Sequence, residues 1–378
     1  MLNNKTTTYS TSESTSIAII IYKRLTENGM LVSDILRKEN NNFDLIRICC
    51  ATMVIIGHCY KLHVPIGKTD LVEALTNFTY SGALAVKIFF FISGLLVTDS
   101  LIKKRSVVSF IISRGFRLLP GLSFELMVTT FIICPFLTTI GAINFLSNPS
   151  IYLYVIKNIV FNTTNILPGI FINNYHSGNV NGSIWTLHYE VKFYFFLLCA
   201  FIILKNNKLL QTIIAISVIF YSFFHLNILG KDPGPEISLL PFSFALGALL
   251  AIYKDKIKIN YLTFLVLAII TTIAWHSFLN ESFFILTVFT FVLLLGKDKY
   301  FKNIKIKHDI SYGIYLWGFF IQQTILMFFP SINFYIFMLL SISLSIFWGF
   351  ISFYFIEKKF MKIGKDLDRN INSRYFSN

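Results

Sequence analysis

An arginine and a histidine share one apolar segment near the start of the chain. Arg47 and His58 are eleven residues apart, so in a helix they face the same way and lie about 16 Å apart along the axis. Histidine titrates near neutral pH and can take a proton from a hydroxyl group. The spacing leaves two interpretations open: a catalytic base, or a histidine that caps the end of a helix.

A polar stripe marks one side of another apolar segment. Its members fall at positions i, i+3, i+7 and i+11, which share a helix face: Ser183, Thr186, Glu190 and Tyr194. We expect Glu190 at a depth comparable with that of His58, where a carboxylate can orient a histidine ring and stabilise its cation. The alternative is a structural ion pair between Glu190 and Lys87 or Lys192.

Two arginines spaced for one helix face follow a basic loop. Arg114 and Arg117 come shortly after the sequence Lys103–Arg105. In a helix, two like charges at this spacing repel each other unless an anion lies between them. Guanidinium groups bind phosphate through paired hydrogen bonds. The pattern is compatible with a phosphate or pyrophosphate site, although ordinary anchoring at a membrane surface is the preferred explanation of these charges taken alone.

Two further features accompany these groups. Ser93 and Gly94 end the sequence Phe89–Gly94, and small residues of this kind let two helices approach closely. Trp185 stands at the beginning of its apolar segment, where tryptophan commonly anchors a helix at the membrane interface. Each feature alone indicates packing rather than chemistry.

The elements that position these side chains follow from the composition. The chain has 378 residues, of which 55% are hydrophobic and 14% are charged, whereas soluble proteins carry about 25% charged residues. A water-soluble enzyme is therefore excluded. The five cysteines show no metal-ligand spacing, so we expect neither a disulfide framework nor a metal site.

Apolar stretches long enough to cross a bilayer recur along the chain. They predict an all-α integral membrane protein, a bundle of about ten transmembrane helices. The predicted segments are 45–62, 82–102, 118–140, 184–204, 209–226, 237–253, 261–278, 283–296, 310–329 and 332–356.

The basic residues are distributed unevenly around these segments. With the N-terminus in the cytoplasm, 27 of the 33 Lys and Arg residues fall on the cytoplasmic side and four fall in outward loops. This bias follows the positive-inside rule, so we expect N- and C-termini in the cytoplasm. Membrane topology also explains the net charge of +14 without nucleic acid as a partner.

The polar segments define the expected domains. Residues 1–42 form a polar cytoplasmic tail with an interfacial helix near 17–36, and residues 43–360 form the membrane domain. Residues 361–378 form a basic cytoplasmic tail. The outward loop at 141–183 is the longest, and long loops are often functional.

Four motifs in this order resemble those of the bacterial membrane acyltransferase family 3, whose members O-acetylate exported polysaccharides. An Arg/Lys-x10-His pattern falls on Arg47 and His58, and an RxxR pattern on Arg114 and Arg117. The FFxxSG pattern ends at Ser93 and Gly94, and the SxWxLxxExxFY pattern covers residues 183–194. Two positions depart from the family: Trp317 stands near an expected histidine, and Lys359 replaces a proline.

The resemblance implies a function and roles for these residues. The enzyme would move an acetyl group from acetyl-CoA, without a metal, to a sugar hydroxyl of O-antigen, capsule or exopolysaccharide at the bacterial inner membrane. The bilayer and the glycan would be its partners; the sequence does not indicate an oligomeric state. The expected catalytic residues are His58, Glu190, Arg47 and Ser93. Donor contacts are expected from Arg114, Arg117 and Arg105, and substrate contacts from Trp185 and Tyr194. His58 would act either as a general base or as a transient acetyl carrier.

Two rival functions have similar hydropathy. A transporter or flippase for lipid-linked glycans would line its path with Arg47, Glu190 and Lys87. Such transporters often contain repeated halves, and no internal repeat is visible in this sequence. A glycan polymerase usually has a basic motif in a large outward loop. In the loop at 141–183, Lys157 is the only lysine or arginine. Acyl transfer is therefore preferred.

Overall fold

The computed structural model describes residues 29–63, 69–204, 207–225, 236–297, 304 and 306–375. These residues form two compact units. The first comprises the described parts of Met1–Asn42 and Tyr253–Asn303, and the second those of Phe43–Ile252 and Ile304–Asn378.

The first unit contains two longer helices and a small sheet. Its elements are β1 (Met30–Leu31), α2 (Val32–Ile35), η1 (Lys38–Asn40), β2 (Lys258–Ile259), α13 (Tyr261–Ile273) and α14 (Asn280–Lys297). The two strands are antiparallel, with Met30 opposite Ile259. An interfacial helix was predicted near 17–36, and its residues 17–28 lie outside the described part. In the described residues the prediction of one continuous helix is wrong, because the strand β1 precedes the short helix α2.

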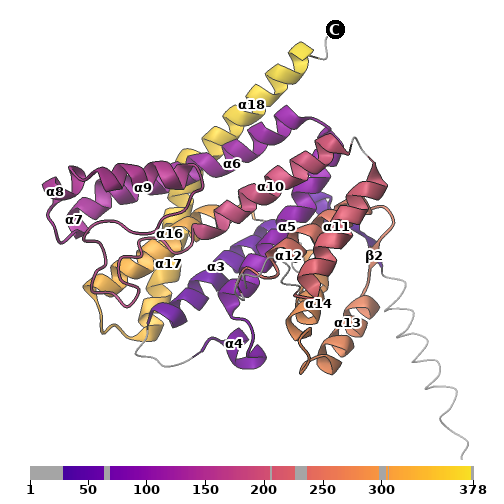
Figure 1. The fold of residues 1–378 in the computed structure, drawn as a ribbon, viewed down its shortest axis with the longest axis horizontal. Helices are drawn as coiled ribbons and strands as arrows, with labels where there is room; N and C mark the ends of the chain where they lie inside the picture. The colour runs from indigo at the N-terminus through magenta and orange to yellow at the C-terminus, as the bar shows by residue number, and fades with distance from the viewer. Residues whose placement is uncertain are drawn as a thin grey trace, which may run out of the picture. The chain divides into compact units, whose positions relative to one another are not determined.

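The second unit is helical and holds every residue of the predicted site. Its first helices are α3 (Phe43–Leu62), α4 (Leu71–Thr76), α5 (Ser81–Lys104), α6 (Val107–Met127), the π-helix η3 (Val128–Ile133), α7 (Cys134–Leu137), α8 (Ala142–Leu146) and α9 (Pro149–Ile159). The later ones are α10 (Trp185–Ile203), α11 (Lys208–Phe223), α12 (Leu240–Ile252), α16 (Ser311–Phe328), α17 (Phe334–Ser352), the π-helix η4 (Phe353–Glu357) and α18 (Lys358–Tyr375). Figure 1 shows their arrangement.

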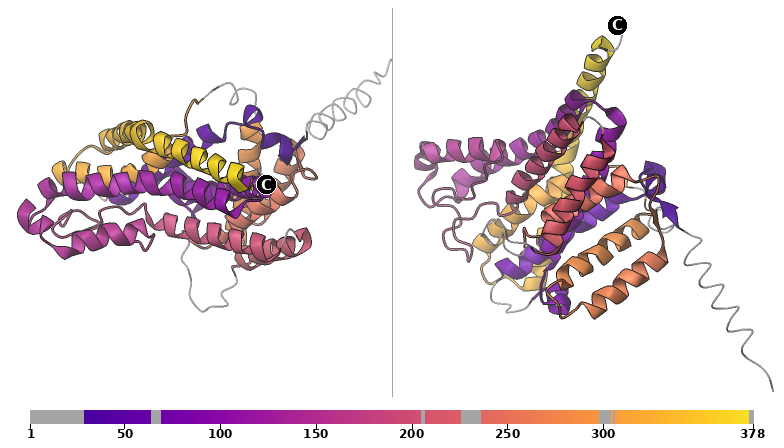
Figure 2. Two further views of the ribbon diagram at one scale, coloured as in Figure 1. Left: turned by 90° about the horizontal axis from the view of Figure 1, so that it is seen from above. Right: turned by 45° about the vertical axis from the view of Figure 1, so that its right-hand side comes forward.

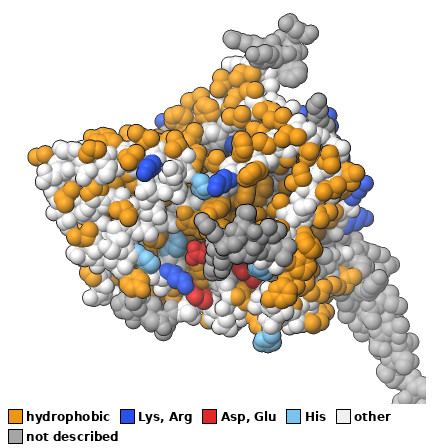
Figure 3. Space-filling view, viewed as in Figure 1, with side chains coloured by type: hydrophobic (Ala, Val, Ile, Leu, Met, Phe, Trp, Pro, Cys, Tyr) orange, Lys and Arg blue, Asp and Glu red, His pale blue; other side chains and the backbone are white. Residues whose placement is uncertain are grey.

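A helix occupies each of the ten predicted segments, and in the part of the chain that the structure describes five helical stretches are long and apolar enough to cross a membrane. These are Phe43–Leu62, Ser81–Lys104, Val107–Leu137, Trp185–Ile203 and Phe334–Ser373. The chain is therefore a multi-pass membrane protein, while ten crossings and the cytoplasmic termini stay predictions. Hydrophobic side chains are spread over the face seen in Figure 3. Phe196 and Ile203 of α10 and Leu339 of α17 are each more than half exposed. Lipid is the expected neighbour of such side chains.

The third segment begins earlier than its hydropathy predicts. α6 starts at Val107, after the Ser106 side chain caps its first turn, rather than at residue 118. Arg114 and Arg117 consequently lie within the helix. Their charges and Pro120 made this part of the sequence resemble a loop.

The C-terminal residues extend the last membrane segment instead of ending it. α17, η4 and α18 follow one another directly up to Tyr375, so the described part of the predicted tail 361–378 is helical. α18 lies alongside α6 (Figures 1 and 2). Asp368 of α18 accepts hydrogen bonds from Lys104, at 2.8 Å, and from Ser109.

The predicted loop 141–183 contains two helices, α8 and α9, before an irregular part. Asn148 caps α9, and Pro149 follows at the first helical position, which suits a residue without an N–H. An isolated bridge pairs Ile166 with Asn179 in the irregular part. This part leads directly into α10.

Two glycines set the distance between α5 and α12. A Cβ atom on Gly94 would lie 2.1 Å from the carbonyl oxygen of Phe244, and one on Gly247 would lie 2.2 Å from that of Phe91. Neither position has room for a larger residue. This confirms the interpretation of Gly94 as a site of close helix approach.

Candidate active site

A cavity of about 370 Å³ lies within the second unit, at the end of α3 that carries Arg47. Residues of α3, α5, α6, α10, α16 and α18 line it. Five lining residues are Lys or Arg and two are Asp or Glu. The cavity therefore carries an excess of positive charge, which suits an anionic ligand.

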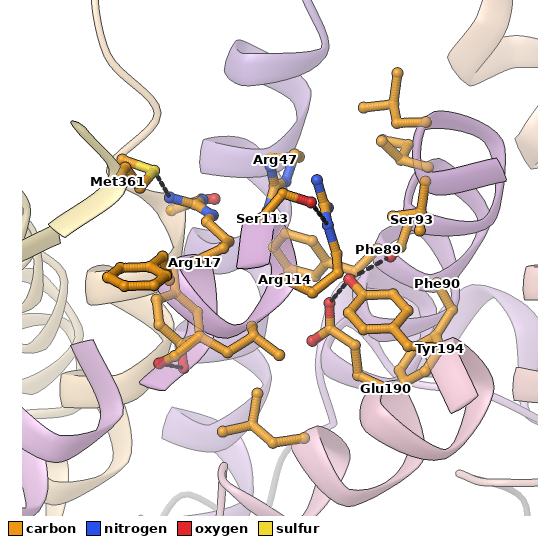
Figure 4. Close-up of a pocket in the computed structure, with 18 of the residues that line it drawn as sticks. Arg47, Phe89, Phe90, Ser93, Ser113, Arg114, Arg117, Glu190, Tyr194 and Met361 are labelled. Carbon is orange, nitrogen blue, oxygen red and sulfur yellow. Dashed lines mark hydrogen bonds between the residues drawn. The ribbon is translucent and has the colours of Figure 1, made fainter. Parts of the chain in front are cut away.

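One wall of the cavity is a chain of three hydrogen-bonding side chains. Tyr194 donates to Glu190, and the Tyr194 hydroxyl lies 3.0 Å from the Ser93 Oγ atom. Because the tyrosine proton is directed at the carboxylate, Ser93 is the donor in the second bond. Figure 4 shows the three side chains together beside Arg114, whose guanidinium lies 6.0 Å from the centre of the Tyr194 ring.

A second wall is formed by Arg47 and Arg117, which belong to a network of partly buried charges. Asp309 lies 2.6 Å from Arg47 and 2.9 Å from Arg117. Arg117 also contacts Glu357 at 3.3 Å, and Ser352 donates to that carboxylate at 2.9 Å. Burial raises the pKa of Asp309, but Arg47 and Arg117 outweigh it and leave the pKa below its usual value. The carboxylate is therefore ionised at neutral pH, and the network ties α3, α6 and η4 to the start of α16.

The predicted donor-binding arginines have different surroundings. Two carboxylates neutralise Arg117, whereas Arg114 has no carboxylate partner among the described residues, and its Nε atom is 3.4 Å from Ser113 Oγ. Lys365 also lines the cavity, and Lys104 does so while paired with Asp368. Arg105 caps the end of α5 and does not line the cavity.

His58 lies beyond the cavity on the same helix as Arg47. α3 confirms that both residues belong to one helix with the predicted spacing. The His58 Nδ1 atom is buried without a hydrogen-bond partner, and the ring meets Phe319 edge-on at 5.3 Å. A neutral imidazole with an uncommitted nitrogen can accept a proton or attack a carbonyl.

A turn of α16 stands between the cavity and His58. Tyr315 and Thr186 belong to the cavity lining. Tyr315 donates to the Ser183 carbonyl at 2.6 Å and accepts from Thr186 at 2.6 Å. Phe319 follows Tyr315 by one helical turn, about 6 Å along the axis. This turn of α16 therefore contacts the cavity at Tyr315 and His58 at Phe319.

The structure separates two residues that the sequence placed together. Glu190 lines the cavity and accepts from Tyr194, while His58 Nδ1 has no partner. No hydrogen bond joins Glu190 to His58 within the described structure, so the orienting role expected of Glu190 stays a prediction. Trp185 begins α10, packs edge-on against Tyr189 at 5.7 Å and lies outside the cavity lining.

Sequence reasoning gave little weight to several important residues. Asp309 and Glu357 stand at segment boundaries, where single acidic residues are usually exposed. Asp309 nevertheless pairs with Arg47 and Arg117, and Glu357 pairs with Arg117. Glu125 is fully buried in α6, and Asn181 donates to it at 3.0 Å. A charged residue inside an apolar segment is the one signal that could have identified Glu125. Within the described ranges, no group of three His, Cys, Asp or Glu residues could hold a metal ion.

Comparison with known proteins identifies the family. Residues 40–356 match the family model described as an acyltransferase domain, acyltransferase family 3. The chain is 27% identical over 338 residues to the "O-acetyl transferase" of Shigella phage Sf6, covering 85% of this chain and 96% of that protein. It is also 27% identical over 314 residues to "Nodulation protein 10" of Rhizobium leguminosarum bv. viciae, covering 76% and 84% of the two chains. No solved structure matches.

The matched region contains α3 to α17, and with them the Ser93–Tyr194–Glu190 chain and the Arg47–Asp309–Arg117 contacts, whereas Glu357 and α18 lie beyond its last residue. The family assignment therefore applies to most of the site as well as to the fold. It favours acyl transfer over the transport of glycans. The chain belongs to acyltransferase family 3 and is a membrane enzyme, an O-acetyltransferase.

Proposed function

We propose that this chain transfers the acetyl group of acetyl-CoA to a hydroxyl of a cell-surface polysaccharide, at the outer side of the bacterial inner membrane. The acceptor would be O-antigen, capsule or exopolysaccharide. The observation that carries the proposal is the cationic cavity, together with a histidine further along one of its helices. α3 contributes Arg47 to the cavity lining and also carries His58, whose Nδ1 atom has no hydrogen-bond partner. This arrangement suits an anionic donor bound in the cavity and a base or nucleophile, His58, further along α3.

The donor phosphates would bind where positive charge is not already neutralised. Arg114 has no carboxylate partner within the described structure, and Lys365 lines the same cavity. Guanidinium binds phosphate strongly through paired hydrogen bonds. Since 370 Å³ is small for a whole nucleotide-bearing donor, the cavity would hold the acyl-pantetheine arm while the nucleotide stays outside.

The arm would lie between the two walls. The Ser93–Tyr194–Glu190 chain offers polar atoms to the amide groups of the arm. Arg47, near the start of α3, lines the cavity and is held in place by its ion pair with Asp309. Movement of the Phe319 ring would then let the thioester approach His58.

Acetyl transfer needs a base because a hydroxyl is a weak nucleophile at neutral pH. His58 would take the proton from the sugar hydroxyl as its oxygen attacks the thioester carbonyl. The new C–O bond forms, the C–S bond breaks, and the CoA thiolate takes the proton from the imidazolium. In the second route, the His58 imidazole attacks the thioester carbonyl first, the C–S bond breaks, and the CoA thiolate leaves with the imidazole proton. The sugar oxygen then displaces the imidazole from the acetyl carbon, and the imidazole takes the hydroxyl proton.

The test compares surface glycans from cells with and without the protein. The glycan of a deletion strain is purified, and acetyl methyl signals are counted by NMR after complementation with wild type or His58→Ala. The proposal expects acetyl signals with wild type alone. Full acetylation by His58→Ala would exclude both routes, and unchanged acetylation in the deletion strain would exclude the proposed function.

A further inference from the structure

A second cavity lies at the opposite end of α3 from Arg47. Its volume is about 250 Å³, and its lining includes Leu62 and His63. Leu62 is 15 residues beyond Arg47, or about 22 Å along the helix axis. The other walls come from the irregular part of the loop 141–183 and from the end of α16.

The lining of this cavity is uncharged. Among the described residues around it there is no Lys, Arg, Asp or Glu, while Thr139, Asn173 and Asn174 supply hydroxyl and amide groups. Burying a charged group without a partner is costly, so the lining disfavours a charged ligand. A neutral molecule with several hydroxyl or amide groups fits best, in contrast to the cationic first cavity.

His63 contributes an acceptor that no described residue satisfies. Its side chain is 7% exposed, and its Nε2 atom lies 2.8 Å from the carbonyl oxygen of Ile332. A carbonyl only accepts hydrogen bonds, so Nε2 carries the proton and Nδ1 presents a lone pair. Nδ1 is buried without a partner. A buried acceptor in this state favours a ligand that donates an O–H or N–H group.

The orientation of His63 is fixed by its neighbours. The ring stacks on Phe337 at 5.7 Å and meets Phe334 at 5.6 Å. Together with the Ile332 bond, these contacts hold the lone pair in one direction. A ring held in this way loses little freedom when a ligand binds, which lowers the entropic cost of binding.

The loop wall is also fixed in place. The fully buried Gln323 donates to the carbonyl of His176 at 3.0 Å and to that of Asn179 at 2.8 Å, and accepts from Asn174 at 2.9 Å. Phe171, which lines the cavity, has a φ of 52°. A non-glycine residue in the left-handed region is strained, and such strain is concentrated at ligand sites.

We propose that this second cavity binds one neutral sugar residue of the acceptor glycan, with a sugar hydroxyl donating to His63 Nδ1. The inference rests on the proposed function and adds a subsite to it. His63 is five residues beyond His58, about 8 Å along α3. The bound sugar would thus be a neighbour of the residue that is acetylated, and the cavity would select glycans by that neighbour.

His63→Gln tests the hydrogen bond. Glutamine can keep an N–H near the Ile332 carbonyl but has no counterpart of Nδ1. Acetyl transfer is measured with purified protein, acetyl-CoA, and either the unacetylated glycan of the deletion strain or the monosaccharides from its hydrolysis. We expect the KM for the glycan to rise about five- to tenfold, as for one lost hydrogen bond. The KM for acetyl-CoA and transfer to monosaccharides stay unchanged.

Filling the cavity provides a second test. Met327 lines it, whereas the adjacent Phe328 is 59% exposed and does not. Met327→Trp is expected to raise the KM for the glycan, and the matched control Phe328→Trp is expected to leave it unchanged. Neither should alter transfer to monosaccharides.

The possible contrary results are distinct. An unchanged KM for the glycan in both His63→Gln and Met327→Trp would overturn the subsite. Equal slowing with glycan and monosaccharides would assign His63 a structural role and would also overturn it. A wild-type protein that transfers no acetyl group to the glycan or its monosaccharides would remove the proposed function, and the subsite with it.

Discussion

At the scale of single residues, the difference between Arg114 and Arg117 matters most. Both were predicted to bind the donor because they share a helix face. The structure shows that Arg117 already has two carboxylate partners, whereas Arg114 lacks one within the described ranges. Spacing could predict a shared face but not the partners, because Asp309 and Glu357 are about 190 and 240 residues away in sequence.

Arg114→Ala should therefore weaken the donor interaction. We expect the KM for acetyl-CoA to rise at least about tenfold, since a hydrogen bond to a charged group is lost, with little change in the KM for the glycan. Arg105→Ala is the matched control because Arg105 lies outside the cavity lining. Steady-state kinetics on purified variants would measure both, and equal effects would contradict the assignment to Arg114.

The pairing of Glu190 with His58 shows a different limit. The 3.6-residue period correctly placed each residue on a helix. Whether two such residues meet depends on how α10 packs against α3, and one sequence contains no direct signal for this. The described structure instead joins Glu190 to Tyr194, four residues later on the same helix.

At the scale of elements, buried charges and glycines hold the helices around the cavity. Hydropathy located the apolar segments well but placed the start of α6 at residue 118 instead of Val107. The first turns of α6 contact α18, whose Asp368 accepts from Ser109 of α6 and from Lys104 at the end of α5. A local window of sequence does not contain these distant partners.

Replacing Asp309 should destabilise the bundle. Asp309→Ala would leave Arg47 and Arg117 facing each other without their shared anion. Breaking a buried pair typically costs about 3–5 kcal/mol, which lowers Tm by several degrees. Asp366→Ala is the control because its contact with Arg369 is exposed and long, at 3.8 Å. Thermal unfolding in detergent that gave equal Tm values for both variants would show that the network is not stabilising.

Glycine substitutions test the packing of α5 against α12. Gly94→Ala would place a methyl group 2.1 Å from the backbone of Phe244 and should force the two helices apart. Gly115→Ala is its counterpart, because a Cβ atom there meets nothing within 4 Å. Alanine at such a helical site is expected to stabilise by up to about 1 kcal/mol. A higher Tm for Gly94→Ala than for wild type would refute the close approach.

At the scale of the whole molecule, the charge bias predicts which ends of the helices face the cytoplasm. The first cavity would open to the cytoplasm, where acetyl-CoA is made, and the second to the outside. The sequence predicts this polarity from 27 basic residues on one side against four on the other. Labelling of introduced cysteines tests it.

Ser177→Cys and Asp366→Cys suit this purpose because both residues are exposed. In a variant without the native cysteines, a membrane-impermeant maleimide should label Ser177→Cys in intact spheroplasts. It should label Asp366→Cys only after the membrane is permeabilised. The reverse pattern would invert the topology.

The most direct test of the central claim is acetyl transfer by the purified protein in lipid bilayers. Acetyl-CoA labelled in the acetyl group is supplied with the unacetylated surface glycan, and the label on the glycan is measured for wild type and His58→Ala. We predict labelled glycan with wild type and a loss of at least about a hundredfold with His58→Ala, the usual contribution of a general base. Wild-type rates in His58→Ala, or no labelled glycan with wild type, would contradict the account.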